Sequence, residues 1–511
     1  MALLKRYRDE IILGFLVLVA AALRLWDLGG QGFWRDEAQG LYIAAKGFPG
    51  GIIAALSHDG HPPLYYLLMH FWMLAFGRGE FAVQLFSALC GVAAVPLVYA
   101  LGRRLYDRPT ALLATLVATL LPMHIQLSRS ARMYALVALV ATAALYLAHE
   151  AVTRGGRWRH AGLALTCLGA LYSHNWGVFL VAAINVWWVL MLLVYPAARR
   201  RWWQWAVAQV AVGVFYLPWL PILQAQREAL VVAATWGKVG SHIDNLLRMM
   251  NELTGLVLPR DYWLAWLFLG ALGLLVVRVS RQEVSVSLPL EPAPLLTACT
   301  LVLPLVLGTY LTPKSIGVIP SYVTIVAFPA LCLALGRGAW AFRRWWAVAG
   351  VLLLMGLLWW PGLTGTLTAV TSNLREVAAY VESRAAPGDV LIIAPDYLAT
   401  TFNYYYRGGQ EQVAFPMAPG RTEEIIWAEY NARWQQADRQ IEPTIAFVDR
   451  ALGPGGRVWL IGPVQSYQGN PMFEQIRALK ARLDGRYNLQ EEITHFRGPV
   501  ETADVYVYRR E

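Results

Sequence analysis

Two adjacent carboxylates follow the first long apolar run of the chain, in the sequence WRDEA at residues 34–38. Only 15 acidic residues occur in residues 1–372, so this pair needs a reason. Asp36 could cap a helix predicted at Ala38–Lys46, because aspartate accepts hydrogen bonds from first-turn amides. Alternatively, one carboxylate acts as a base on a substrate hydroxyl while a neighbouring group orients it. We take Asp36 and Glu37 as candidate catalytic residues.

A second polar stretch lies in the same loop, at His58, Asp59 and His61, just before Pro62-Pro63. Imidazole and carboxylate groups so arranged could ligate a divalent cation. The interpretation that we favour is a set of exposed loop residues in front of a Pro-Pro stop. The prolines end the loop and preset φ for the helix that follows. A divalent cation is thus allowed by the sequence but not required.

Cationic side chains recur beyond a later apolar run, at Arg129 and Arg132. They could snorkel to lipid headgroups. Their guanidinium forks also suit a phosphate or pyrophosphate carried by a lipid. Further polar groups are expected at the same depth of the membrane, namely His124, His174, Asn175 and Lys314.

The elements that position these residues must lie in a bilayer. The chain has 511 residues, of which 57% are hydrophobic and only 15% charged, whereas an ordinary soluble domain has about 25% charged residues. The net charge of +10 divides into +13 for residues 1–372 and −3 for residues 373–511. Lysine and arginine next to membrane spans explain this excess, and no motif indicates a nucleic-acid partner. The four cysteines lie singly in apolar runs, which argues against a disulfide framework or a thiolate metal site.

Arginine-rich loops alternate with less basic ones, and with the basic N-terminus they are expected in the cytoplasm. Leu64–Phe76 is apolar, but its 13 residues are too few to cross a bilayer alone. If this segment lies along the outer interface, every basic loop falls inside and the tail falls outside. We therefore predict eleven spans in the plasma (inner) membrane, at about 11–26, 81–102, 109–126, 132–152, 161–174, 177–196, 203–223, 261–278, 293–311, 321–337 and 345–362.

The composition changes after Gly362. Residues 1–362 are interpreted as a transmembrane catalytic domain and residues 373–511 as an extracytoplasmic α/β domain, since helices and strands alternate there. The predicted helices of this domain are Leu374–Ser383 and Phe473–Leu483, and the predicted strands are Val390–Ala394, Val458–Ile461 and Asp504–Tyr508. The long loop at 224–260 is expected to cover the outer face.

Three motifs, in this order, resemble polyprenyl-phosphate-sugar-dependent glycosyltransferases of the GT-C fold. They are Trp-x-Asp-Glu at 34–37, His-Pro-Pro-Leu-Tyr-Tyr at 61–66 and Ser-Arg-x-x-Arg-Met-Tyr-Ala-Leu at 128–136. A late segment from Thr312 to Tyr322 is similar to the same pattern. The protein O-mannosyltransferase and lipid A aminoarabinose transferase branches are the most similar, over about residues 1–340. The fold class implied is an α-helical polytopic membrane protein, GT-C-like, with a C-terminal soluble α/β domain.

The resemblance implies a sugar donor on a polyprenyl phosphate and a lipid, glycan or protein acceptor reached from outside. Asp36 matches the family's catalytic acidic position, with Glu37 beside it, and Arg129, Arg132 and Lys314 would hold the phosphate. His61 stands where the aminoarabinose branch has lysine, whereas the mannosyltransferases also have His-Pro-Pro. The tail does not match the mannosyltransferases' lumenal β-trefoil. The other cavity residues expected are His58, Asp59, His61, His124, His174, Asn175 and Tyr322.

Two other functions are compatible with the sequence. A ligase of the same fold would move an oligosaccharide or polymer from a lipid pyrophosphate, and a one-sugar product would argue against it. A transporter of lipid-linked sugars would place ionisable residues midway along several spans. The predicted spans are nearly free of such residues, which favours the transferase.

Overall fold

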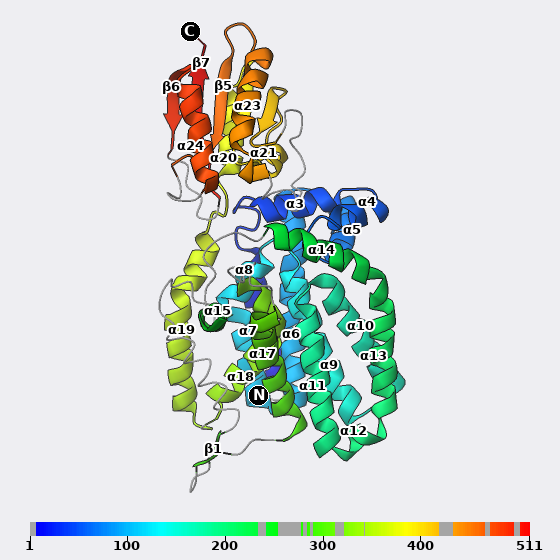
Figure 1. The fold of residues 1–511 in the computed structure, drawn as a ribbon. Coiled ribbons are helices and arrows are strands. Elements are labelled where there is room, and N and C mark those ends of the chain that lie inside the picture. Colours follow the sequence, from blue (N-terminus) through cyan, green and yellow to red (C-terminus); the bar gives the residue numbers. More distant parts are fainter. Residues whose placement is uncertain are drawn as a thin grey trace.

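The computed structural model describes residues 7–233, 242–253, 277–279, 284–286, 290–311, 321–341, 343–417, 433–465, 471–494 and 501–510. These residues form a helical bundle and a smaller α/β part at one end of it (Figure 1). Each part has its own large hydrophobic core, and the second core begins at Leu374. Helix α19 (Trp345–Thr368) leads from the bundle to the α/β part.

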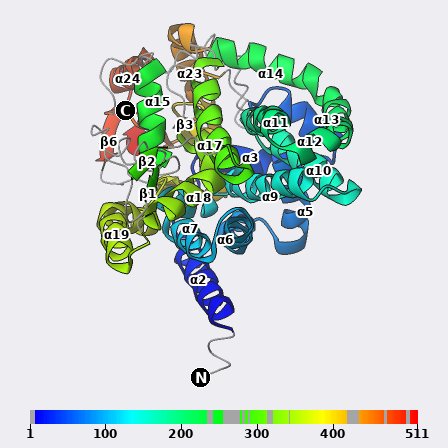
Figure 2. The same cartoon turned by 90° about the horizontal axis from the view of Figure 1, so that it is seen from below.

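In the part of the chain that the structure describes, the bundle consists of α-helices and two 3₁₀ segments. Its described helices are α2 (Arg8–Leu25), α3 (Arg35–Ala44), α4 (Gly50–Leu56), α5 (Leu64–Phe76), α6 (Glu80–Leu105), α7 (Arg108–Leu120), α8 (Pro122–Ser128), α9 (Tyr134–Thr153), α10 (Arg157–Ser173), α11 (Gly177–Val194), α12 (Pro196–Arg200), α13 (Trp202–Tyr216), η1 (Leu217–Trp219), α14 (Leu220–Ala233), α15 (His242–Leu253), α17 (Pro292–Leu311), η3 (Ser321–Ala327), α18 (Phe328–Ala339) and α19. Figure 2, seen from below Figure 1, shows α2 beside α6 and α7 at the edge of the bundle.

Among the described residues, six helices are long and apolar enough to cross a membrane, or seven if α7 and α8 form one bent span. The chain is therefore a multi-pass membrane protein, but this number does not reach the predicted eleven spans. Two of the predicted spans are not among these helices. Helix α2 carries four charged residues, Arg8, Asp9, Glu10 and Arg24, and α10 has only 17 residues. The expected span at 321–337 begins with 3₁₀ helix, and most of the one at 261–278 lies outside the described residues.

The end of the bundle next to the α/β part is covered by short helices rather than by loops alone. Leu64–Phe76 is a single helix, α5, as predicted, and it lies beside α3 and α4 at this end (Figure 1). The loop predicted at 224–260 was wrong in part, because α14 and α15 occupy much of it. An amphipathic pattern in this stretch is consistent with helices at an interface.

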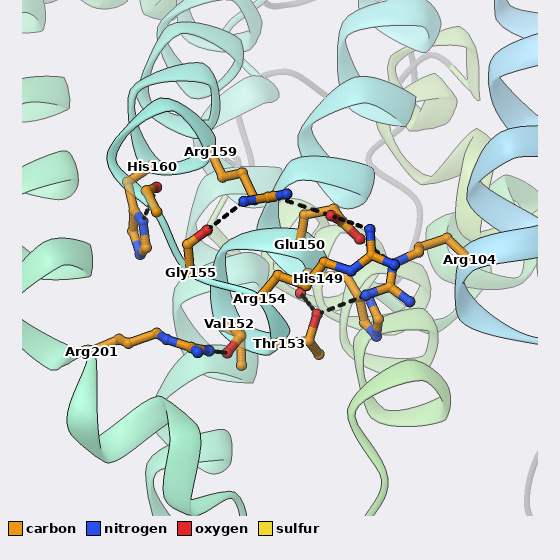
Figure 3. A network of polar contacts seen from close by, with 11 residues as sticks. Arg104, His149, Glu150, Val152, Thr153, Arg154, Gly155, Arg159, His160 and Arg201 are labelled. Atoms are coloured by element: carbon orange, nitrogen blue, oxygen red, sulfur yellow. Dashed lines mark hydrogen bonds and ion pairs between the residues drawn. The ribbon is translucent and has the colours of Figure 1, made fainter.

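The opposite end gathers the basic loops around one buried carboxylate (Figure 3). Glu150, near the end of α9, accepts hydrogen bonds from Arg104, Arg154 and Arg159, the latter two at 3.2 Å. Arg201 donates to a backbone carbonyl of the same helix end at 2.6 Å. One acid thus partly neutralises arginines from two of the loops that the sequence places on one side, and a third loop is attached through Arg201.

The α/β part is a mixed five-stranded sheet with helices packed on it. The strand order is β4 (Glu411–Ala414), β3 (Val390–Ile393), β5 (Arg457–Gly462), β7 (Asp504–Arg509), β6 (Asn488–Ile493). β3 is parallel to β4 and β5, whereas β7 is antiparallel to β5 and β6. The helices are α20 (Leu374–Arg384), α21 (Leu398–Tyr405), α23 (Asp438–Ala451) and α24 (Pro471–Asp484). A short antiparallel pair, β1 (Val277–Val279) with β2 (Val284–Val286), lies apart from it.

Candidate active site

Asp36 lies in the first turn of α3, not at its cap. The helix begins at Arg35, and the extended residue before it is Trp34, so the prediction of Asp36 as N-cap is wrong. The side chain of Asp36 is 22% exposed, and its Oδ1 lies 3.5 Å from the Nε of Arg35. A carboxylate is favoured here because first-turn amides carry partial positive charge. Asp36 is thus a partly exposed acid on a helix end.

Glu37 has a different environment, although it is the next residue. Its buried Oε1 accepts hydrogen bonds from the backbone N–H of Ala131 at 2.5 Å and from Ser130 Oγ at 3.1 Å. Its Oε2 accepts from the N–H of Trp34 at 3.4 Å. Burial raises the pKa of Glu37 to about 7, although these hydrogen bonds act in the opposite direction. Glu37 therefore joins α3 to the segment after α8.

Arg132 completes this junction from the other side. Its Nη1 donates to the carbonyl oxygen of Asp36 at 2.9 Å, and its Nη2 lies 3.2 Å from His61 Nε2. The carbonyl of Arg132 accepts from Ser87 Oγ on α6 at 3.0 Å. A Cβ placed on Gly40 would lie 3.5 Å from Arg132 Nη1, so α3 approaches the guanidinium closely. Arg132 is buried and holds the backbone that carries Asp36.

Asp59 and His61 form a pair that orients this cluster. His61 Nδ1 lies 2.8 Å from Asp59 Oδ1, which also accepts from the N–H of Gly60 at 2.6 Å. Burial alone would raise the pKa of Asp59, but the hydrogen bond and charge of His61 and the charge of Arg132 lower it below its usual value. Asp59 is therefore a fixed carboxylate that orients the His61 ring.

The predicted metal set does not assemble. His58 is exposed, and no group of three or more His, Cys, Asp and Glu side chains in the described ranges is arranged to hold a metal ion. His174 instead approaches His61, with ring centroids 5.8 Å apart, and Asn175 donates to the carbonyl of Gly60 at 2.8 Å. His58 thus lies apart from the cluster that His61 and His174 share.

A second buried cluster joins His124 to a residue that the sequence analysis missed, Arg24. Arg24 donates to the carbonyl oxygens of Ala118 and Thr119, at the end of α7, and contacts His124 Nδ1 at 2.8 Å. Helix ends leave such carbonyls without partners, so a cation fits there. The signal was available, because an arginine inside an apolar run is rare unless it has a function.

Arg129 is fully buried, and with the amide of Gln31 correctly oriented its Nε and Nη2 donate to the Gln31 oxygen at 2.9 and 2.8 Å. The Nη1 of Arg129, the Nε of Arg24 and the Nε of Arg132 have no hydrogen-bond partner among the residues that the structure describes. Buried guanidinium N–H groups are costly to leave unpaired. Each of these donors is therefore a candidate contact for an anionic ligand.

Two predicted site residues are not tested by this geometry. Lys314 lies outside the described residues, and for Tyr322 only the backbone, in η3, is described. They stay predictions.

A cavity of about 500 Å³ lies between α3 and the α/β part. Positions 38, 41 and 42 of α3 and Ala45 after it line the cavity, whereas Gly40 faces Arg132, so the cavity and Arg132 lie on different sides of the helix. Among the described residues, its remaining lining is mostly polar and has no acidic side chain: Arg78, Gly79, Thr400, Asn403, Tyr404 and Arg407. This size is typical of a small-molecule site.

Replacing Glu37 by glutamine should make stability less dependent on pH. The folded protein holds a proton that the unfolded chain releases between about pH 4.5 and 7, so wild-type stability should fall as the pH rises through this range. We expect the Tm of Glu37→Gln in detergent to fall less over that interval, with the exposed residue changed in Glu228→Gln as control. Parallel curves for wild type and Glu37→Gln would contradict the assignment.

Comparisons with known proteins agree with the expected fold. Residues 60–223 match the family described as "Dolichyl-phosphate-mannose-protein mannosyltransferase". A stretch of 162 residues, 30% of this chain, is 25% identical to a Bacillus subtilis (strain 168) protein named "Putative mannosyltransferase YkcB". That stretch covers 22% of the relative, about a fifth of its length.

Two solved structures resemble the whole chain. ArnT from Cupriavidus metallidurans, bound to undecaprenyl phosphate, has a TM-score of 0.56 and 14% identity, with 96% of this chain and 97% of that chain covered. AglB, an oligosaccharyltransferase from Archaeoglobus fulgidus in complex with an inhibitory peptide and a dolichol-phosphate, has a TM-score of 0.52 and 12% identity, with 99% and 75% covered. The predicted resemblance is confirmed, and the chain has the fold of the GT-C glycosyltransferases.

Proposed function

We propose that this protein transfers a sugar from a polyprenyl-phosphate donor to an acceptor hydroxyl, at the end of the bundle that carries the α/β part. The observation that carries the proposal is the placement of Asp36. Its backbone is fixed by the buried guanidinium of Arg132, whose Nε has no hydrogen-bond partner among the described residues, while its side chain stays partly exposed. A base held in this way beside an anion site suits displacement at a phosphate-activated sugar.

In the proposed step, a carboxylate oxygen of Asp36 takes the proton of the acceptor hydroxyl. The acceptor oxygen forms a bond to the anomeric carbon as the bond from that carbon to the phosphate oxygen breaks. The electron pair of the broken bond stays on the lipid phosphate, so no acid has to protonate this leaving group. Attack opposite to the leaving group inverts the configuration of the anomeric carbon, and a single carboxylate suffices, unlike in glycoside hydrolysis.

The donor phosphate is proposed to bind near Arg129 and Arg132. Each of these buried side chains retains an N–H without a described partner, and Arg24 adds a third. Lys314, which lies outside the described residues, is proposed for the same role. The undecaprenyl phosphate and dolichol-phosphate found with ArnT and AglB, which share the fold, support a lipid-phosphate donor.

The acceptor is proposed to enter through the cavity between α3 and the α/β part. Ala38 lines this cavity and lies two residues after Asp36, on another side of α3, so the hydroxyl of an acceptor bound there would have to reach round the start of the helix to the base. The guanidinium groups of Arg78 and Arg407, together with Tyr42 and Tyr404, would favour a polar headgroup or glycan with negative charge. The acceptor itself can be a lipid, a glycan or a protein.

The arginine-rich end of the bundle supports a proposed orientation. Positively charged loops are retained in the cytoplasm, so the end with Glu150 and Arg201 is proposed to face inward. The α/β part and the candidate site would then face outward from the plasma membrane. The proposal therefore requires a lipid-linked donor whose sugar lies on the outer face.

Asp36→Asn should abolish transfer while leaving the fold intact. Loss of a general base lowers kcat by roughly 10²–10⁴-fold, and asparagine preserves the shape of the side chain. The measurement is transfer of labelled sugar from polyprenyl phosphate in sealed proteoliposomes, with acceptor on the side of the α/β part. Asp438→Asn, an exposed acid of that part, is the control. Near-normal transfer by Asp36→Asn would rule out the base.

Arg129→Lys should lower kcat/KM for the donor by more than the lower stability of the variant explains. Lysine keeps the positive charge but cannot form the fork to Gln31 and present the free Nη1. We expect kcat/KM for the donor to fall about 10²-fold, as when one donor to a developing anion is removed. Unchanged donor kinetics in a variant with a lowered Tm would assign Arg129 a structural role alone.

Arg407→Ala should raise KM for the acceptor about tenfold, since one hydrogen bond to a charged group is worth roughly 1.5 kcal/mol. The donor KM should not change, because Arg407 lies on the cavity side of α3. Arg482→Ala, which removes an exposed arginine paired with Glu442, is the matched control. A change in the donor KM with a constant acceptor KM would place the acceptor elsewhere.

A further inference from the structure

The loop before α3 is hydrogen-bonded to the α/β part. The carbonyl of Gln31 accepts from the N–H of Thr371 at 2.8 Å, and the N–H of Phe33 donates to Tyr405 Oη at 2.7 Å. Gly32, between them, has φ +72°, and a Cβ there would lie 2.9 Å from a backbone oxygen of residue 372. The two backbones thus approach so closely that only glycine fits.

This contact continues into the first turn of α3 through Glu501. Glu501 is buried, and its Oε1 accepts from the backbone N–H of Arg35 at 3.0 Å. Trp34, at the N-cap position, provides no side-chain hydrogen bond to the helix. Free N–H groups in the first turn of a helix need an acceptor, which aspartate or serine usually supplies at the cap. Here a residue 466 positions later in the chain supplies it.

The side chain of Arg35 is held by the same part of the protein. Its guanidinium carbon lies 4.8 Å from the ring centroid of Tyr397, and its Nε lies 3.5 Å from Asp36 Oδ1. The α/β part therefore holds both the amide and the guanidinium of the residue directly before Asp36. Any shift of these contacts would move the candidate base.

Burial and the neighbouring charges determine the protonation state of Glu501. Arg35, Asp36 and Glu37 are the charged groups that face it from α3, and its Oε2 is buried without a hydrogen-bond partner among the described residues. Burial is the largest effect and raises the pKa of Glu501 to about 8, the two carboxylates add to this, and Arg35 opposes it. At pH 7 the group is mostly neutral, so it accepts from Arg35 without adding a negative charge beside Asp36.

We propose that Glu501 is a positioning residue through which the α/β part fixes the first turn of α3 and the orientation of Asp36. The expected effect on kcat rests on the proposed function, whereas the expected effect on the order of α3 does not. The candidate site is then incomplete without the α/β part. A misplacement of a catalytic group by about 1 Å can cost 10²-fold in rate, so the contact matters although Glu501 touches no substrate.

The experiment compares Glu501→Ala and Glu501→Gln in the full chain, with Glu442→Ala, an exposed ion-pair residue of the same part, as control. Hydrogen exchange of the amides in α3 is measured without substrate, and exchange in β3 and β5 reports whether the α/β part stays folded. Glu501→Ala should speed exchange in α3 and lower kcat about 10- to 100-fold, with little change in KM. Glu501→Gln, which mimics the neutral carboxyl, should restore both.

The pH profile separates positioning from simple stabilisation. Wild-type kcat should fall above about pH 8, as Glu501 ionises beside Asp36 and Glu37. This decline should be absent in Glu501→Gln. A wild-type profile in Glu501→Gln, or unchanged exchange and kcat in Glu501→Ala, would overturn the proposal.

Two further outcomes keep the hypotheses distinct. If wild type transfers no sugar but Glu501→Ala still speeds exchange in α3, the proposed function fails and the structural role stands. If Glu501→Ala does not accumulate, Glu501→Asp replaces it, because its shorter side chain cannot reach Arg35 in the same geometry. Normal exchange and kcat in that variant would overturn the proposal.

Discussion

The candidate site depends on the double connection that Glu37 and Arg132 make between α3 and the segment after α8. The carboxylate of one residue accepts the amide of Ala131, while the guanidinium of the other donates to the carbonyl of Asp36. Both side chains are buried, so water cannot replace either partner and the loss of one leaves the other unsatisfied. With this connection in place, Asp36 is the acid of the pair whose side chain remains partly exposed.

The chemistry was easier to predict from the sequence than the arrangement. The acids at 36 and 37, the His-Pro-Pro motif and the two arginines after α8 were identified by residue type and order. The sequence could not distinguish the roles of Asp36 and Glu37, because the two residues are adjacent and only the packing of the fold places one of them in the interior. The same reason explains Arg24, whose partners are carbonyl groups of another helix, and Glu501, whose contact joins residues at the two ends of the chain.

The fold shows a similar division. Hydrophobic periodicity located α5, α20 and β3 almost to the residue, since each is a short, regular segment with clear limits. It missed α14 and α15, where charged residues interrupt the apolar pattern, and it did not foresee β4 or β6. The count of eleven spans stays a prediction, because six or seven helices qualify among the described residues and most of the expected span at 261–278 lies outside them.

The account combines a fixed acid, buried cations whose donors have no partner among the described residues, and a cavity edged by Arg78 and Arg407 on the far side of one short helix. Its central claim is direct displacement of a lipid phosphate from a sugar by an acceptor oxygen. The most direct test is the anomeric configuration of the product formed by purified protein from a polyprenyl-phosphate sugar of known configuration, determined by NMR spectroscopy. The account predicts one transferred sugar with inverted configuration and release of the polyprenyl phosphate. A product with retained configuration would contradict it.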